Sequence, residues 1–598
     1  MKLSDYVADF IHSRGVSDVF MISGGGCMHL VDSIGAHKGI NYYCCLHEQA
    51  CAMATEGYAR VKNNVGACIV TTGPGGTNTL TGVLGCWLDS VPAVFISGQV
   101  KREMLTKPGL RQLGDQEFPI VNAVKSMTKF AALVDDPEKI RYMLEKAFYM
   151  AKNGRPGPVW LDIPLDVQSA NVEPDSLKAF NPEELGGTKA GKDIQLLVKE
   201  TIELMRSAKR PVLIAGKGIR LAGADKEFLL LASRLRMPVL TSFTGIDLIA
   251  NNNPYYQGRQ GTIGTRAGNF IAQNSDLLLC IGTRLNVRMT GYNFPSFARA
   301  AKKIVVDIDA AELGKPTFKP DIPIVSDAKL FINSLLSLLP DEGLEERKPW
   351  LDYCRGIRSA YPVVSQADYV EKGQVDLYAL IDSLSNAMQE NTVLTCANGI
   401  VSVVAYQALK IKDGQRAIFN SGCASMGYGL PAAIGASVAT GKDVVCLEGD
   451  GSLQMNIQEL QTLKHYNLPV KLFVINNGGY LSIKETQRNF FNRRFVASDP
   501  KSGVTFPDLG KIANAYGLPF TRITSNDGLE AALTAILSSS GPIVCEIMCA
   551  PDKGPKTRVV SFTDANGQIK SRPLEDLAPL LPKDELKKAM LIPLYGEK

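Results

Sequence analysis

Asp450 and Asn477 are the residues of this chain whose types and spacing point most directly to chemistry. Asp450 lies in a Gly-Asp-Gly turn that follows the apolar run 444–447, and Asn477 follows a second apolar run, 470–475. The segment between them carries apolar residues at helical spacing. This order predicts one βαβ unit. Such a unit places both polar residues at the carboxyl ends of parallel strands, where open α/β sheets bind ligands.

The oxygen atoms at this predicted edge suit a magnesium ion that holds a diphosphate. Asp450 offers a carboxylate, Asn477 an amide oxygen and Gly479 a backbone carbonyl, and Mg²⁺ takes oxygen ligands while keeping positions for water and phosphate. Gly449 and Gly451 would let a diphosphate approach the backbone closely. For the Gly-Asp-Gly turn alone, a capping role of the aspartate is the better interpretation. The Asn-Asn pair after the second strand favours the magnesium–diphosphate site.

Composition excludes several classes of protein. The 598 residues carry a net charge of +5, and 45% of them are hydrophobic. This balance gives no reason to expect nucleic acid or an anionic membrane as a partner, and no apolar run reaches the ~18 residues of a membrane span. The chain starts without a signal-peptide pattern, its 13 cysteines include no C-x-x-C pair, and its five histidines form no cluster. We therefore expect a cytoplasmic protein with reduced thiols.

Alternating strand-like and helix-like segments predict an α/β protein with three doubly wound parallel sheets. Two stretches rich in charged residues and proline, with little periodicity, read as linkers between the domains. The predicted segments are a first domain at 1–180, a linker at 171–190, a second domain at 191–340, a linker at 341–372, a third domain at 373–550 and an extended arm at 551–598.

Three stretches together resemble the thiamine diphosphate enzymes. They are the segment 449–477, the stretch HEQ-x6-EGYAR that begins at His47, and the turn TGPGGTN at 72–78. Residues 1–550 resemble the acetohydroxyacid (acetolactate) synthase branch of that family. The resemblance implies an N-terminal pyrimidine-binding domain, a central FAD-type domain and a C-terminal domain that binds diphosphate and Mg²⁺.

Glu48 opens a predicted helix directly after the strand 41–45. By itself, a glutamate in the first turn of a helix is ordinary, because it complements the helix dipole. Within the resemblance, Glu48 matches the carboxylate that shares a proton with ring N1′ of the aminopyrimidine and so activates the cofactor. Gln116 falls where the family places a glutamine that reaches toward the active centre. The resemblance thus implies that both residues are catalytic.

Met426 matches the large apolar residue that forces the family's cofactor into its bent shape. Without the resemblance, a plain core methionine is an equal interpretation. The positions that the resemblance assigns to thiamine diphosphate are Glu48, Thr72, Pro74, Asn78, Asn398, Gly399, Met426, Gly449, Asp450, Gly451, Ser452 and Asn477.

The second predicted domain matches the family's flavin site in part. Gln260 replaces a histidine of the family and Asn286 replaces an aspartate, but both can still form hydrogen bonds. We therefore expect FAD to bind, in a structural role, because the expected reaction involves no net redox change. The positions assigned to FAD are Arg155, Gly216, Gly218, Gln260, Arg284, Arg288, Asp307 and Asp327.

Larger departures occur where the family selects its second substrate. The family's GQHQMW stretch is replaced by the residues at 398–403, and Thr486 stands where the synthases have a tryptophan. A smaller side chain at this position leaves more space for the second substrate. Our hypothesis is that the acceptor is not 2-oxobutyrate. The alternatives are pyruvate itself and a carbonyl compound bulkier than pyruvate.

The resemblance implies an enzyme that decarboxylates pyruvate and transfers the two-carbon unit to a carbonyl acceptor. With pyruvate as acceptor the product is acetolactate. The alternatives are a 2-oxo acid decarboxylase, an FAD-linked oxidase and a non-catalytic paralogue that binds thiamine diphosphate; the intact Glu48, Asp450 and Asn477 argue against the last. The family's architecture implies a homodimer or homotetramer in which Glu48 of one subunit faces the diphosphate site of the other. Whether a regulatory subunit binds stays open.

Overall fold

The structure is a computed structural model that describes residues 1–186, 193–370, 373–564 and 566–597. Positions 187–190 of the first predicted linker, the predicted domain start at 191, the end of the second linker at 371–372 and the last residue, 598, lie outside these ranges. The predicted fold class is confirmed: the chain forms three six-stranded sheets, and every pairing within them is parallel.

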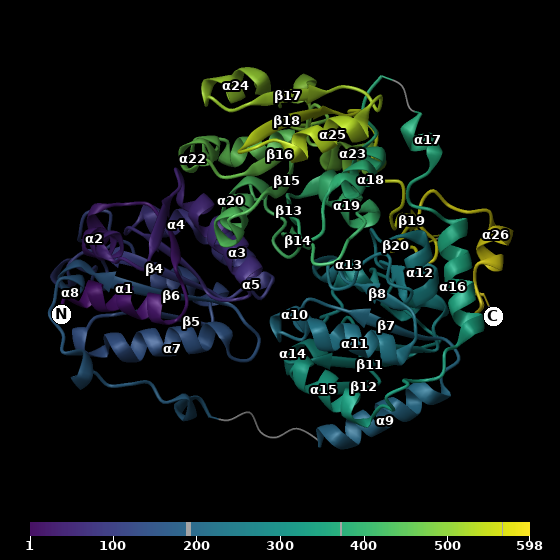
Figure 1. Ribbon diagram of the computed structural model, residues 1–598, viewed down its shortest axis with the longest axis horizontal. Coiled ribbons are helices and arrows are strands. Elements are labelled where there is room, and N and C mark those ends of the chain that lie inside the picture. The colour runs from purple at the N-terminus through teal and green to yellow at the C-terminus, as the bar shows by residue number, and fades with distance from the viewer. Residues whose placement is uncertain (187–192, 371–372, 565, 598) are drawn as a thin grey trace.

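The N-terminal sheet, purple to blue in Figure 1, has the strand order β2-β1-β3-β4-β6-β5. Its inner strands are buried along their whole length, which explains their continuous apolar runs. The strands are β1 (Asp18–Met21), β2 (Asn41–Cys44), β3 (Gly66–Val70), β4 (Ala93–Gln99), β5 (Phe130–Leu133) and β6 (Pro158–Pro164). The helices are α1 (Leu3–Ser13), α2 (Met28–Ala36), α3 (Glu48–Lys62), α4 (Pro74–Asn78), α5 (Leu80–Leu88), α6 (Ile120–Val124), α7 (Ile140–Lys152) and α8 (Leu165–Gln168).

The central sheet has the order β12-β11-β10-β7-β8-β9. The strands are β7 (Pro211–Ala215), β8 (Val239–Thr241), β9 (Tyr256–Gly258), β10 (Leu277–Ile281), β11 (Lys302–Asp307) and β12 (Ile322–Val325). The helices are α9 (Ile194–Ser207), α10 (Gly218–Leu221), α11 (Asp225–Leu235), α12 (Arg266–Asn274), α13 (Val287–Thr290), α14 (Ala310–Leu313) and α15 (Ala328–Leu338).

The C-terminal sheet, green to yellow in Figure 1, has the order β14-β13-β15-β16-β18-β17. Its strands are β13 (Val393–Cys396), β14 (Arg416–Phe419), β15 (Val444–Gly449), β16 (Val470–Asn476), β17 (Phe520–Ile523) and β18 (Ile543–Met548). The helices are α18 (Leu377–Ala387), α19 (Gly399–Ala408), α20 (Gly429–Thr440), α21 (Asp450–Leu453), α22 (Glu459–Tyr466), α23 (Leu481–Phe490), α24 (Leu509–Ala515) and α25 (Leu529–Ser538).

The second predicted linker is not a simple linker. It contains α16 (Lys348–Ala360), followed by the short α17 (Gln366–Tyr369). Trp350, Leu351 and Cys354 bury one face of α16, and Trp350 packs in an apolar cluster of the central domain. The charged residues that suggested a linker occupy the opposite, solvated face of an amphipathic helix.

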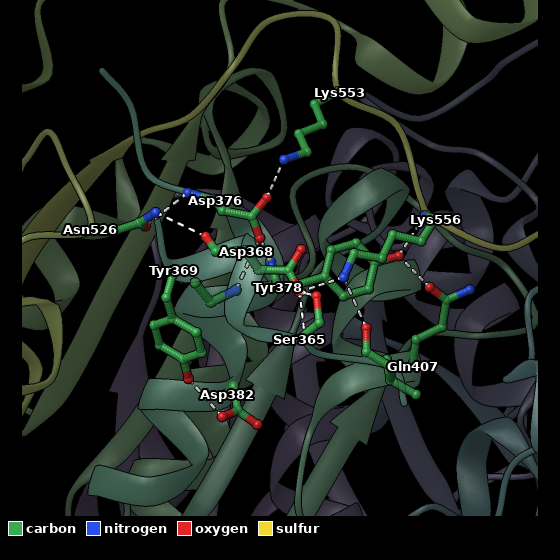
Figure 2. A network of polar contacts seen from close by, with 12 residues as sticks. Ser365, Asp368, Tyr369, Asp376, Tyr378, Asp382, Gln407, Asn526, Lys553 and Lys556 are labelled. Carbon is green, nitrogen blue, oxygen red and sulfur yellow. Dashed lines mark hydrogen bonds and ion pairs between the residues drawn. The ribbon is translucent and has the colours of Figure 1, made fainter. Parts of the chain in front are cut away.

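The C-terminal arm is fastened by two lysines at its start, one to the third domain and one to α17. Lys553 pairs with Asp376 and Lys556 pairs with Asp368, and both carboxylates are buried (Figure 2). The backbone N–H of Lys556 also donates to the Tyr378 hydroxyl at 2.7 Å. Beyond this fastening, the arm forms a hairpin and one short helix: β19 (Ser561–Thr563), β20 (Ile569–Ser571) and α26 (Lys583–Lys588).

The N-terminal and C-terminal domains share one continuous apolar core, centred on the contact between α3 and α20. Two glycines allow these helices to approach closely. A methyl carbon added at Gly435 would lie 1.9 Å from the carbonyl oxygen of Ala54, and one added at Gly57 would lie 2.3 Å from that of Ala432. The helix carrying Glu48 is therefore held against the third domain of its own chain.

We predict that Gly435→Ala destabilises the protein by about 1–3 kcal/mol, because the added carbon overpacks this contact. A fall in the thermal unfolding midpoint would show it. Gly356→Ala is the matched control, since that glycine lies within α16 with open space around the added carbon, and the change should leave stability unchanged or slightly raised. Equal midpoints for the two variants would contradict the tight contact.

Candidate active site

Asp450 and Asn477 lie side by side at the carboxyl edge of the third sheet, as the sequence predicted. β15 and β16 are paired in register up to Gly449 and Ile475. Asp450 then begins α21, while Asn477 directly follows β16. The two strand ends bring the residues together because parallel neighbours end at the same edge.

The Asp450 carboxylate is held by four backbone N–H groups. Its Oδ2 accepts from Asn477 at 3.0 Å, Gly478 at 2.8 Å and Gly479 at 3.3 Å, and its Oδ1 accepts from Gly451 at 2.7 Å. Burial raises the pKa of Asp450 to about 6, although these N–H groups act in the opposite direction. The chain thus fixes a carboxylate whose charge is only partly compensated by the protein.

The amide oxygen of Asn477 supports a cation at this position. Asn477 is 8% exposed, and its Oδ1 has no hydrogen-bond partner although it is buried. A buried acceptor without a partner is costly unless something absent from the protein satisfies it. The Gly479 carbonyl accepts from the N–H of Leu481 and keeps one lone pair. The donor set is therefore all oxygen, which is the chemistry of a Mg²⁺ site.

For the magnesium site predicted from the sequence, metal binding should weaken as the pH falls below about 6. Folding raises the pKa of Asp450 from 3.8 to about 6. In the metal-free protein, the protonated Asp450 therefore stabilises the folded state fully at pH values below 3.8. This stabilisation is lost as the pH rises through about 6. Mg²⁺ competes with the bound proton, so its apparent affinity should fall about tenfold per pH unit below that point. Calorimetric titration at several pH values would measure this, and a flat profile would contradict it.

Glu48 lies at the start of α3, and its helix is capped by the His47 side chain, which accepts from the backbone N–H of Gln49. The Glu48 Oε2 accepts from Asn78 Nδ2 at 2.9 Å. Asn78 ends α4, the short helix that opens with Pro74. The structure thus brings together the predicted activating carboxylate and one predicted thiamine contact, Asn78.

Gln116 lies in the long segment between β4 and α6, as an exposed residue with a φ of 56°. Its backbone packs on the thiamine-side turn: a carbon added at Gly73 would lie 2.2 Å from the Gln116 carbonyl oxygen. Gly73 has a φ of 57°, a conformation that favours glycine. The predicted catalytic glutamine is therefore adjacent to the turn that begins with Thr72.

Met426 lies in a loop, residues 420–428, that is held from two sides of the third domain. Asn398 Nδ2 donates to the Ala424 carbonyl at 2.7 Å, and the Gly427 N–H donates to Ser452 Oγ at 2.9 Å. Asn398 precedes α19, which begins at Gly399 with a φ of 70°. Two of the predicted cofactor residues of this domain, Asn398 and Ser452, therefore hold the loop that carries Met426.

Glu48 does not connect the predicted site residues of the N-terminal domain to those of the C-terminal domain. Within the ranges that the structure describes, the hydrogen bond of Glu48 goes to its own domain, and no hydrogen bond or ion pair joins it to residues 449–479. The neighbouring Gln49 does contact the third domain, because its Oε1 accepts from Asn456 Nδ2 at 3.0 Å.

A cleft of about 430 Å³ lies at the junction of the three domains. Five of the eight positions predicted for FAD line it: Arg155, Gly218, Arg284, Asp307 and Asp327. Three do not. Gly216 packs against the Gly282 carbonyl, Gln260 is fully buried, and the Arg288 guanidinium lies over the ring of Phe243, which does line the cleft.

One polar group at this cleft supports a ligand. Asn286 lines the cleft, and its buried Oδ1 has no hydrogen-bond partner. The amide atoms of Gln260 also have none, but Gln260 is buried outside the lining. Arg155 is less available, since it already pairs with Asp309 at 3.0 Å and Glu312 at 2.8 Å. The cleft therefore fits a group that can satisfy amide oxygens.

Sequence reasoning missed three residues of this cleft: Asp89, Lys217 and Ser421. Lys217 donates to the Asp89 carbonyl at 3.0 Å, and burial, with Arg60 nearby, lowers the pKa of Lys217 to about 7. The Asp89 carboxylate accepts from the N–H of Ser421. The sequence did contain one signal for Lys217: it lies between Gly216 and Gly218, which were both predicted to contact FAD.

No helix among the described residues is both long and apolar enough to cross a lipid bilayer. No group of three or more histidine, cysteine, aspartate or glutamate residues that could hold a metal occurs in the same ranges. The magnesium site proposed from Asp450 and Asn477 does not depend on such a group, because one of its two side-chain ligands is an amide.

Comparison with known proteins agrees with this geometry. Residues 1–118, 198–335 and 397–547 match the N-terminal TPP binding domain, the central domain and the C-terminal TPP binding domain of thiamine pyrophosphate enzymes. The acetolactate synthase large subunit of Cyanidium caldarium is 34% identical over 558 residues, covering 91% of this chain and 92% of its own. The acetolactate synthase isozyme 2 large subunit of Escherichia coli (strain K12) is 33% identical, covering 92% and 95%. The resemblance seen in the sequence is confirmed, and the chain belongs to the thiamine pyrophosphate enzyme family, in its acetolactate synthase-like branch.

Proposed function

We propose that this thiamine diphosphate-dependent enzyme decarboxylates a 2-oxo acid, pyruvate, and joins the two-carbon unit to a carbonyl acceptor. With pyruvate as acceptor the product is acetolactate. The observation that supports this most is that Asn477, whose backbone N–H donates to the Asp450 carboxylate, carries a buried side-chain Oδ1 without a hydrogen-bond partner. It supplies the oxygen ligands through which Mg²⁺ would anchor the cofactor's diphosphate.

The residues of this chain do three things in the proposed reaction. Asp450, Asn477 and the Gly479 carbonyl would hold Mg²⁺, and the loop around Met426 would set the bend of the cofactor. Glu48, oriented by Asn78, would share a proton with ring N1′ of the aminopyrimidine. When bound, thiamine diphosphate supplies the carbanion and the electron sink that decarboxylation needs. Gln116 would act near the reacting carbonyl.

FAD in the three-domain cleft is the second part of the proposal. The buried, unpartnered Oδ1 of Asn286 supports it, and five predicted positions line the space. Its role would be structural, because carboligation involves no net oxidation. A visible absorption spectrum of the purified protein tests this directly: flavin bands support the assignment, and a protein that neither carries nor takes up FAD contradicts it.

Several relatives are named large subunits, as in Escherichia coli and Cyanidium caldarium. For this chain we propose a homodimer, or a pair of dimers, in which Glu48 of one subunit serves the Asp450 site of the other. The hydrogen bond of Glu48 within its own domain leaves that arrangement open. All 13 cysteines are free thiols, which supports the reducing environment of the cytoplasm.

Incubation with pyruvate, thiamine diphosphate and Mg²⁺ separates the proposed reaction from its alternatives. Acetolactate supports the carboligase, acetaldehyde as the sole product indicates a decarboxylase, and oxygen uptake indicates an oxidase. Labelled pyruvate offered with a panel of aldehydes and ketones, followed by mass spectrometry, identifies the acceptor. If the protein consumes no 2-oxo acid, the proposal is wrong.

A further inference from the structure

Gln99 is a buried glutamine at the end of β4 whose amide is fully engaged. It is 1% exposed. Its Oε1 accepts from the Thr72 hydroxyl at 2.7 Å and the Val100 N–H at 2.9 Å, while its Nε2 donates to the Phe118 carbonyl at 2.9 Å and to Asp162 Oδ2 at 3.0 Å. This pattern fixes the amide orientation, because the reverse would set the amide oxygen against the Phe118 carbonyl and the Asp162 carboxylate, and the amide N–H against the Val100 N–H.

The hydrogen bonds of Gln99 reach both halves of the N-terminal part of the site. Thr72 begins the thiamine-side turn, and Phe118 ends the segment that carries Gln116. The same two segments also touch directly where Gln116 packs on Gly73. Gln99 is therefore the one described side chain that hydrogen-bonds to both segments.

Gln99 is itself held by the core of the domain. Asp162, on β6, also accepts from Ser97 Oγ at 2.6 Å, and Ser97 Oγ accepts from Trp160 Nε1 at 2.8 Å. Ser97 and Trp160 are fully buried, and Asp162 is 1% exposed. A buried, fully satisfied network of this kind gives its members a single geometry.

We propose that Gln99 is a positioning residue that ties the segment carrying Gln116 to the thiamine-side turn. It is not a catalytic residue, because every hydrogen-bonding atom of its amide is used within the protein. Gln99 would affect the reaction through Gln116. In the proposed reaction Gln116 lies beside the reacting carbonyl, and its position there would set how much of the two-carbon unit left by decarboxylation reaches the acceptor. This inference rests on the carboligase function proposed above.

The test compares Gln99→Glu, Gln116→Ala and the double variant. Glutamate keeps the shape of Gln99 but places an acceptor oxygen against the Phe118 carbonyl and Asp162. The readout is the ratio of acetolactate to acetaldehyde formed from pyruvate. Each single change should lower this ratio about tenfold, and the double variant should be no lower than Gln116→Ala alone, since the two residues act as one unit.

Asp162→Asn is the matched control, because it retains an amide oxygen for the Gln99 Nε2 and should leave the ratio within about twofold of wild type. Losses that multiply in the double variant, or an unchanged ratio in Gln99→Glu, would overturn the proposal.

A second measurement does not depend on catalysis. The segment between Gln99 and Phe118 exposes Arg111, and trypsin should cut there about tenfold faster in Gln99→Glu than in wild type or Asp162→Asn, because local opening governs cleavage. An equal rate in all three proteins would also overturn the role of Gln99. If the wild type consumes no 2-oxo acid, the proposed function fails, but the trypsin rates still decide whether Gln99 holds this segment.

Discussion

Glu48→Gln should lower the rate of pyruvate turnover by about 10³-fold, the size expected for loss of a positioned proton-transfer group. Glutamine has nearly the same shape as glutamate, and its amide oxygen can still accept from Asn78 Nδ2, which lies 2.9 Å from Glu48 Oε2. The variant should therefore fold normally. What it loses is the carboxylate that can share a proton with ring N1′ of the aminopyrimidine.

Two measurements separate activation from binding in Glu48→Gln. The affinity for thiamine diphosphate with Mg²⁺ should stay within a few-fold of wild type, because the diphosphate site lies in another domain. Exchange of the thiazolium C2 proton for deuterium on the bound cofactor should slow in step with turnover. Glu138→Gln, which changes an exposed glutamate of the same domain, should alter neither. Turnover that survives in Glu48→Gln would show that another group activates the cofactor.

Asn477→Ala should weaken binding of thiamine diphosphate and Mg²⁺ by about 100-fold with little effect on the stability of the cofactor-free protein. The reason is that the Asn477 Oδ1 has no partner within the protein, so its removal breaks no protein hydrogen bond. A side chain that served only the fold would show the opposite pattern. Calorimetric titration measures the affinity, and thermal unfolding without cofactor measures the stability.

Asp450→Asn provides the contrast to Asn477→Ala. Its amide would turn an N–H group toward some of the four backbone donors that now point at the carboxylate, so this variant should lose both cofactor affinity and stability. If Asn477→Ala binds the cofactor as tightly as wild type, the amide oxygen is not a metal ligand.

The sequence predicted the three parallel sheets because their inner strands are buried on both faces and read as continuous apolar runs. It also predicted that Asp450 and Asn477 meet, since adjacent parallel strands end at one edge. The charged stretch before the third domain was interpreted wrongly as a linker. Acidic and basic residues are both frequent in this stretch, and only the spacing of Trp350, Leu351 and Cys354 reveals the buried face of α16.

Other features could not be read from sequence because they depend on long-range partners. The predicted flavin contact Arg155 is paired with Asp309 and Glu312, more than 150 positions away. Gln99 ends β4, and its link to Thr72 and Phe118 appears only when the turn and the loop fold onto that strand. Residue types predict which chemistry is available, while the fold decides which groups are already satisfied.

We propose that a carboxylate from one subunit activates a cofactor that is held by another. Co-expression of Glu48→Gln and Asp450→Asn subunits with different affinity tags, followed by purification of protein that carries both tags, tests it most directly. If the site is shared, a mixed dimer contains one site with both residues intact and one with neither, and the protein that carries both tags should recover about half of wild-type activity. If each site is built within one chain, every site in the mixture carries a defect, and activity as low as that of the two parents would contradict the account.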